Sequence, residues 1–286
     1  MTARTEDGQR TEVHARCGSA PRYQWIQHRR AGDALKPLTA NGSGGRRSKL
    51  RFGPTTGSTT WTTAPPMHVA RRQGNLVLLP DGSQLMVGGE TNTPTTFPSW
   101  VTTFAKKPEL FKDNSWRQLA EETSPRDYHS TALLLPDGRV LSAGGESHTW
   151  SYQIFSPPYL SCGGTRPQNV VLQTPNGGAA TFDSTRPAYL LTYNQQFIVQ
   201  CSGLPVATTN LAKIVLTAPG SVTHHTDMHQ RCIELASAVD PLQPGAHDRR
   251  LAQMPPNDKH APRGYYMLWA LTNHGVPSVA TWIYIQ

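Results

Sequence analysis

Short apolar runs separated by turn residues dominate the chain from about residue 61 onward. Residues 76–79 and 132–135 form two such runs, and Pro-Asp-Gly follows each of them directly. A second apolar run comes next in both places and ends at a Gly-Gly pair. Runs this short, bounded by turn residues, predict buried β-strands rather than helices. We therefore expect an all-β protein.

The two runs belong to two copies of one phrase. Pro80 and Pro136 occupy the same place in the two copies, and so do Gly88 and Gly144. A fixed period of strand, tight turn, strand and Gly-Gly is typical of kelch-type propeller blades. Residues 61–160 are therefore predicted to form part of a kelch-type β-propeller.

The pattern changes in the C-terminal part of the chain. Segments such as 196–200, 212–217, 264–271 and 278–285 alternate between apolar and polar residues and are separated by Gly, Pro and Asn. Several short strands with turns of this kind predict a β-sandwich of immunoglobulin-like size over residues 165–286.

Residues 1–60 lack this regularity. They contain a Gly-Ser-rich stretch followed by a basic one, which is typical of a flexible linker. We expect this segment to be disordered or unrelated to the rest. No apolar signal-peptide core is visible in it, and no stretch of the sequence is apolar enough to span a membrane. The location of the protein stays open on these grounds.

Charge and cysteine content indicate which kinds of binding partner and metal site are not expected. The formal net charge of the 286 residues is +8, but much of the basic excess lies in the early segment without aromatic residues between the charges. Nucleic acid is therefore not an expected partner. The 4 cysteines are scattered without a Cys-x-x-Cys pair, which argues against a zinc ribbon and leaves any disulfide pairing open.

Side chains that can bind metal occur at two places. Tyr128 and His129 stand directly before the second apolar run, and His224, His225 and His229 lie in one later loop. Neutral imidazole binds copper, zinc and iron, and a phenolate oxygen adds an anionic ligand. Neighbours in an extended strand point to opposite faces, so Tyr128 and His129 can share one ion only where the strand begins or bends.

The phrase Arg126-Asp-Tyr128-His129-Ser130, followed by Leu-Leu-Leu-Pro-Asp-Gly-Arg-Val, resembles the last metal-bearing blade of galactose oxidase and its glyoxal oxidase relatives. These are copper-radical oxidases with a propeller and a C-terminal β-sandwich. The resemblance covers roughly residues 65–286. Its other parts are the segment 153–160, Thr223-His224 with Gln230-Arg231, and the closing segments 262–268 and 275–280.

The resemblance implies one copper ion bound by Tyr128, His129 and His224, with Tyr128 also acting as the general base. It implies oxidation of a small primary alcohol, aldehyde or carbohydrate by O2, giving H2O2, in an extracellular or cell-surface protein. His225 and His229 have no counterpart in the family's pattern, so we expect them to be ordinary loop histidines.

One part of the family's site has no match in this sequence. The family's oxidation also needs a radical on a second tyrosine, cross-linked to a cysteine, and both lie upstream of the matching motifs. Cys17 and Tyr23 are the nearest candidates, and neither lies in a blade phrase. The resemblance therefore implies a truncated oxidase that is weakly active or inactive.

The residues leave two other functions open to comparison. A non-catalytic β module that binds a glycan or a protein is the main alternative. A zinc hydrolase using the three loop histidines is disfavoured, because neither a helical pattern nor a general-base carboxylate accompanies them. Arg71 and Arg72 stand where the family has an arginine near the substrate mouth, and a solvated charge is an equal explanation.

Overall fold

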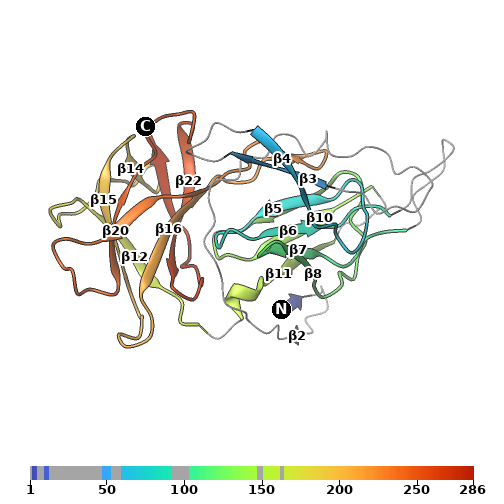
Figure 1. Ribbon diagram of the computed structural model, residues 1–286, viewed down its shortest axis with the longest axis horizontal. Helices are drawn as coiled ribbons and strands as arrows, with labels where there is room; N and C mark the ends of the chain where they lie inside the picture. The colour runs from blue at the N-terminus through green and yellow to red at the C-terminus, as the bar shows by residue number, and fades with distance from the viewer. Residues whose placement is uncertain are drawn as a thin grey trace. The chain divides into compact units, whose positions relative to one another are not determined.

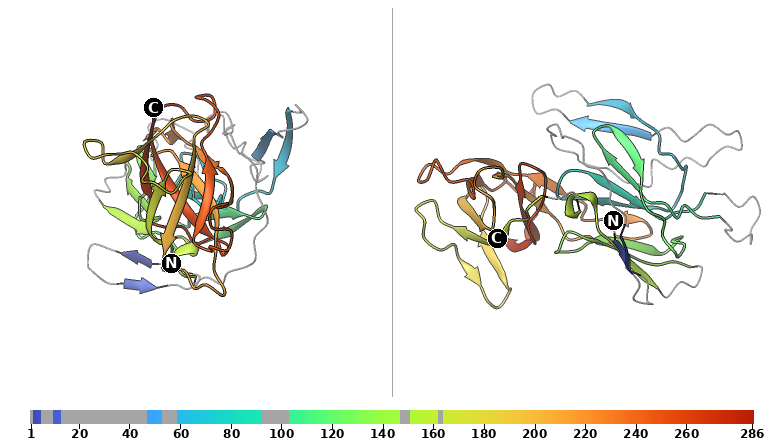
Figure 2. Two further views of the ribbon diagram at one scale, coloured as in Figure 1. Left: turned by 90° about the vertical axis from the view of Figure 1, so that its left-hand side faces the viewer. Right: turned by 90° about the horizontal axis from the view of Figure 1, so that it is seen from below.

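The computed structural model describes residues 2–4, 10–12, 47–52, 59–91, 103–146, 151–161 and 164–286. Strands and loops make up this part of the chain, and its one helical segment is the 3-10 turn Pro158–Leu160. The all-β prediction is therefore confirmed. The chain divides into two compact units, drawn in Figures 1 and 2. Unit 1 comprises residues 1–135, 139–156 and 220–230, and unit 2 comprises residues 136–138, 157–219 and 231–286.

The first repeat forms an antiparallel sheet of four strands in unit 1. Its strands follow chain order: β5 (Asn75–Leu78), β6 (Gln84–Val87), β7 (Glu109–Lys112) and β8 (Ser115–Gln118). The Pro-Asp-Gly segment turns the chain between β5 and β6, and Gly82 N–H donates to the carbonyl of Leu79 at 3.0 Å. A four-stranded sheet in which each strand pairs with the next is the unit from which propellers are built.

The second repeat forms the same hairpin, and its sheet has three strands among the described residues. Its strands are β9 (Ser130–Leu134), β10 (Val140–Gly144) and β11 (Tyr152–Phe155), in the order β11-β10-β9. The Asn75 amide donates to the hydroxyl of Ser130 at 3.0 Å, so the first strands of the two repeats are joined by a buried hydrogen bond. The repeat predicted from the sequence is thus a structural repeat as well.

Four further strands lie in the N-terminal segment. β1 (Thr2–Arg4) pairs with β2 (Arg10–Glu12), and β3 (Arg47–Phe52) pairs with β4 (Thr59–Ala64). Cys17, Tyr23 and most of residues 1–60 lie outside the described residues. The expectation of a disordered or unrelated segment therefore stays a prediction.

Unit 2 is a sandwich of two sheets, visible in Figures 1 and 2. One sheet has the order β12-β15-β21-β20 and the other the order β13-β14-β23-β22-β16-β19. Fully buried apolar side chains such as Phe197, Leu216 and Leu268 fill the core between them. The strands are β12 (Gln168–Gln173), β13 (Phe182–Asp183), β14 (Ala188–Leu191), β15 (Gln196–Ser202), β16 (Leu211–Thr217), β19 (Cys232–Glu234), β20 (Ala236–Val239), β21 (Arg249–Gln253), β22 (Gly264–Thr272) and β23 (Thr281–Ile285).

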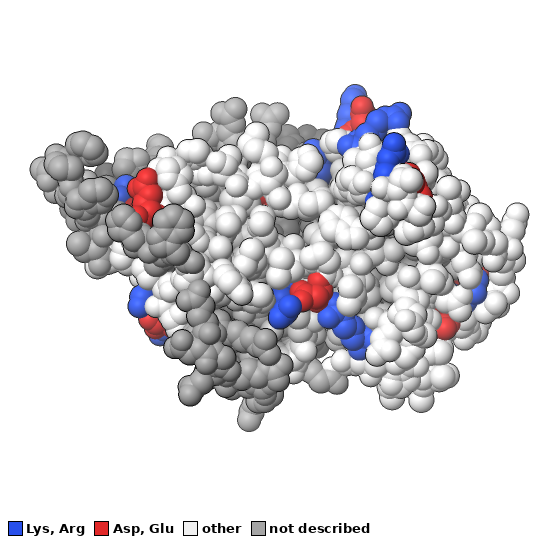
Figure 3. Space-filling view, turned by 180° about the vertical axis from the view of Figure 1, so that it is seen from behind, with Lys and Arg blue, Asp and Glu red and all other residues white. Residues whose placement is uncertain are grey.

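Charged side chains are sparse on the surface shown in Figure 3, where many of the basic groups among the described residues lie beside acidic ones. On this face, the mixed pattern differs from the basic patch or stripe that is typical of nucleic-acid binding. In the described part of the chain no helix is long and apolar enough to span a membrane.

Candidate metal centre

Tyr128 and His129 lie in a turn that leads directly into β9. The turn is closed by the Ser130 N–H, which donates to the carbonyl of Asp127 at 3.1 Å. His129 has a φ of 62°, in the left-handed region that few residues other than glycine adopt. Because the backbone bends here, neighbouring side chains no longer point to opposite faces. The rings of Tyr128 and His129 lie side by side, with their centroids 3.9 Å apart. The bend that a shared ion requires is therefore present.

His224 and His225 form the two-residue loop of a short hairpin in unit 1. The loop joins β17 (Val222–Thr223) to β18 (Thr226–Asp227), whose last pair is Thr223 with Thr226. The Asp227 carboxylate accepts from the Ser221 N–H at 2.9 Å and from the His229 N–H at 3.0 Å, which holds the base of the hairpin.

The hairpin is fastened to the first repeat by the side chain of Gln230. Its amide donates to the carbonyl of Leu76, in β5, at 2.6 Å. This contact holds the two histidines beside the sheets of unit 1, although the sequence places the hairpin between strands of the sandwich.

The structure brings together the rings of all three predicted ligands. The centroids of His129 and His224 are 5.0 Å apart, and those of Tyr128 and His224 are 5.6 Å apart. His225, expected to be an ordinary loop residue, joins the cluster with its ring centroid 5.7 Å from that of Tyr128. His229 is exposed on the same hairpin.

Hydrogen bonds orient two of the imidazoles. His129 Nδ1 lies 3.1 Å from a carboxylate oxygen of Glu146, and His224 Nδ1 lies 2.7 Å from the Thr223 hydroxyl oxygen. With Nδ1 engaged in this way, Nε2 is the nitrogen of each ring that is left to bind a metal. Sequence motifs did not point to Glu146, because its role depends on the turn that brings it to His129.

The donor set fits copper. Imidazole nitrogen and phenolate oxygen are ligands that Cu(II) binds well, and both nitrogens of the buried His225 ring have no hydrogen-bond partner. Among the described residues, however, no three His, Cys, Asp or Glu side chains already stand in metal-binding geometry. Binding would therefore require the exposed rings of His129 and His224 to turn toward the ion.

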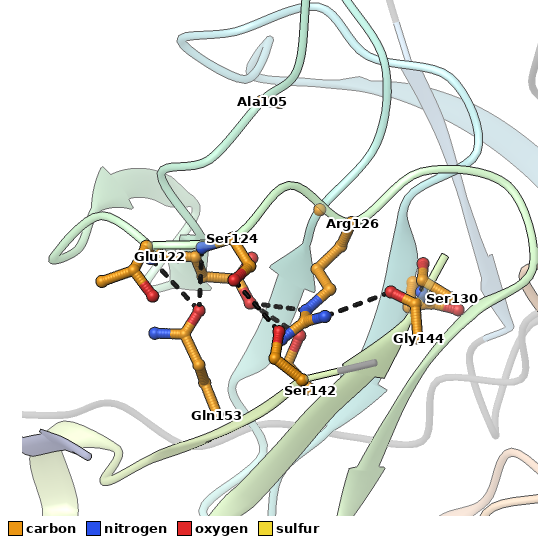
Figure 4. A network of polar contacts seen from close by, with 12 residues as sticks. Ala105, Glu122, Ser124, Arg126, Ser130, Ser142, Gly144 and Gln153 are labelled. Atoms are coloured by element: carbon orange, nitrogen blue, oxygen red, sulfur yellow. Dashed lines mark hydrogen bonds and ion pairs between the residues drawn. The ribbon is translucent and has the colours of Figure 1, made fainter. Parts of the chain in front are cut away.

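A buried polar network supports the turn that carries Tyr128 (Figure 4). The Arg126 guanidinium donates to the carbonyl of Gly144 at 3.2 Å, and its Nε lies 3.8 Å from the Glu122 carboxylate. The Ser142 hydroxyl donates to that carboxylate at 2.6 Å. Burial raises the pKa of Glu122 to about 7, although the Ser142 hydrogen bond and the Arg126 charge act in the opposite direction.

We expect the stability of unit 1 to fall as the pH rises from about 4.5 to about 7 because of Glu122. A carboxyl whose pKa is higher in the folded state binds more protons there, so stability is lost as the pH rises from the unfolded pKa to the folded one. A shift from 4.5 to about 7 corresponds to roughly 3 kcal/mol. Glu122→Gln should remove this loss in urea denaturation at several pH values. The exposed neighbour variant Glu121→Gln should keep it, and an unchanged pH profile in Glu122→Gln would contradict the assignment.

The two arginines of the first repeat are engaged in ion pairs. Arg71 Nη2 lies 2.6 Å from the Glu109 carboxylate, and both side chains are fully buried. Arg72 Nη2 lies 2.6 Å from the Glu90 carboxylate and is partly exposed. Arg71 is therefore neither a solvated charge nor available to a substrate.

Two family models match the chain. The one described as "Glyoxal oxidase N-terminus" matches residues 5–161, and the one described as "Galactose oxidase-like, Early set domain" matches residues 180–285. The first match begins well before residue 65, so the similarity extends into the N-terminal segment that the motifs did not reach. The chain belongs to the galactose oxidase and glyoxal oxidase family.

Curated relatives and a solved structure agree with this placement. The chain is 32% identical to aldehyde oxidase GLOX1 of Arabidopsis thaliana over 79% of its own length and 37% of that protein. It is 31% identical to galactose oxidase of Gibberella zeae over 80% of its length and 32% of that protein. It thus spans only about a third of these relatives. A fungal alcohol oxidase solved in complex with copper shares the fold, with a TM-score of 0.66 and 24% identity over 84% of this chain and 48% of that one.

Proposed function

We propose that this chain is the copper-binding part of an alcohol or aldehyde oxidase, with Tyr128, His129 and His224 as copper ligands. The observation that carries the proposal is the convergence of these three rings from two distant segments within unit 1. Bonds from imidazole nitrogen to a metal ion such as zinc are about 2 Å long, so rings at these separations are close enough to share one ion. The names of the relatives, aldehyde oxidase and galactose oxidase, support the substrate class.

In the proposed oxidation of an alcohol, each residue of the site has its own role. Tyr128, with its phenol half-buried beside His129, takes the hydroxyl proton of the bound alcohol as general base. His129 and His224 are exposed, so a small substrate can reach the cluster from solvent. Copper, when bound, supplies one-electron redox chemistry and lowers the pKa of a coordinated phenol. Overall, a primary alcohol loses two electrons and two protons to O2, which gives an aldehyde and H2O2.

The proposal includes weak or absent turnover in this chain. Two-electron chemistry in the family needs a second, cross-linked tyrosine, and we infer that this chain does not supply it. Cys17 and Tyr23 lie outside the described residues. We therefore propose that the chain retains copper while producing little peroxide from simple alcohols, aldehydes or galactose.

Copper loading of the purified chain tests the proposal. Elemental analysis and EPR should show nearly one Cu(II) per chain with nitrogen hyperfine structure. His224→Ala should lower the copper affinity at least about tenfold, the scale on which disturbing a metal site acts. His229→Ala, in the same hairpin, is the matched control and should leave the affinity unchanged. No retained copper, or equal retention in His224→Ala, would remove the metal site and leave a non-catalytic β module as the function.

A further inference from the structure

The loop that carries His224 and His225 has an unusual composition for its geometry. Both residues have positive φ, 51° and 63°, and together they connect two paired strands. A two-residue hairpin loop with positive φ at both positions strongly prefers Asn-Gly, because a Cβ atom is disfavoured there. Left-handed backbone costs a residue with a side chain about 1–2 kcal/mol. Two histidines at these positions therefore oppose the local stability of the hairpin.

His225 adds a second unfavourable feature. Its residue is 8% exposed, and neither ring nitrogen has a hydrogen-bond partner. A buried polar group without a partner costs about 1–3 kcal/mol. A neutral imidazole with an unused lone pair is also the form that binds a metal ion.

The surroundings of His225 supply the other ligands. Its ring and that of His224 lie at nearly equal centroid distances from the ring of Tyr128, 5.7 and 5.6 Å. Tyr128 is in turn stacked beside His129. Strain and an unpaired buried nitrogen in the same loop, beside three other donors, are explained together if the loop is selected to hold an ion.

We propose that His225 is a further metal ligand, so that the site of this chain consists of three imidazoles and one phenol. This inference rests on the proposed copper site and adds to it a donor for which the matching motifs have no counterpart. Three imidazoles and one phenolate, all from unit 1, would complete a four-donor set once the exposed rings of His129 and His224 turn toward the ion. Metal binding then requires no second tyrosine from elsewhere, which separates copper retention from oxidase activity in this chain.

The test compares His225→Asn with wild type in the full chain. Asparagine tolerates left-handed backbone, so the hairpin is expected to form in this variant. Pulsed EPR of the Cu(II)-loaded protein should count three imidazoles in wild type and two in His225→Asn. Competition with a chelator should show an affinity at least about tenfold lower. Without metal, His225→Asn should be more stable than wild type, whereas replacing a merely structural histidine would lower the stability.

The outcomes separate this inference from the proposed function. Wild type with two imidazoles, both kept in His225→Asn, would overturn the role of His225 and leave the copper site of His129 and His224 intact. Wild type that retains no copper would overturn both. His229→Ala serves again as the control for a histidine of the same hairpin outside the cluster, and a loss of one imidazole in that variant would contradict the ligand set.

Discussion

Arg71→Met is expected to destabilise unit 1 by about 3–5 kcal/mol, which is the usual cost of removing one partner of a buried ion pair. The Arg71 guanidinium also donates to the carbonyls of Gly88, at 2.9 Å, and Lys107, at 3.0 Å. Its loss would leave the Glu109 carboxylate charged and fully buried. In the intact protein, burial by itself raises the pKa of Glu109, but hydrogen bonds from His68, Val69 and Arg71 leave it below the ordinary value, so the carboxyl is charged beside Arg71.

The double variant Arg71→Met/Glu109→Gln should recover at least half of the loss, because no unpaired charge remains in the interior. Urea denaturation combined with hydrogen exchange of peptides from each unit measures the effect, and peptides of unit 2 act as an internal reference. Lys213→Met removes the surface pair with Glu234 at 2.8 Å and should cost less than about 1 kcal/mol. A cost for Arg71→Met no larger than for this control would show that the pair contributes little.

The strands of both repeats could be predicted from the sequence because each is specified by residues within it or directly after it. The alternation of buried and half-buried residues in β5 and β9 follows the two-residue period of a strand. Pro-Asp-Gly fixes the turn that follows each of them. Local patterns could not predict that residues 220–230 belong to unit 1. Contacts between residues far apart in sequence, such as the hydrogen bond from Gln230 to Leu76, hold the segment there.

The candidate site also has a part that the sequence predicted and a part that it did not. Tyr128, His129 and His224 were named from motifs that resemble a known family, whereas the spacing gave His225 no role. Its burial arises from packing against unit 1, which no local pattern encodes. No local signal marked the hairpin either, because two-residue hairpin loops are recognised by pairs such as Asn-Gly or Asp-Gly, and His224-His225 is not such a pair.

Gly88→Ala is expected to destabilise unit 1 by about 3 kcal/mol or more and to weaken metal binding as well. A Cβ at this position would lie 2.6 Å from the Cβ of Arg126 and 2.7 Å from its carbonyl oxygen, and φ is +63°. The backbone strain and the steric overlap add about 1–2 and 1–3 kcal/mol respectively. Since Arg126 lies two residues before Tyr128, its displacement would also move the turn that presents Tyr128 and His129.

Substitutions of two other glycines in the repeats separate the cost of backbone strain from the cost of steric overlap. A Cβ on Gly82, whose φ is +81°, would meet nothing within 4 Å, so Gly82→Ala should show the backbone cost alone. Gly144 occupies the place of Gly88 in the second repeat, and its φ is +73°; its nearest contact would be at 3.4 Å, an ordinary van der Waals distance, so its cost should also be close to the backbone cost alone. Only Gly88→Ala should also lower the copper affinity, measured by chelator competition. Equal effects of the three substitutions would show that packing against Arg126 does not position the turn.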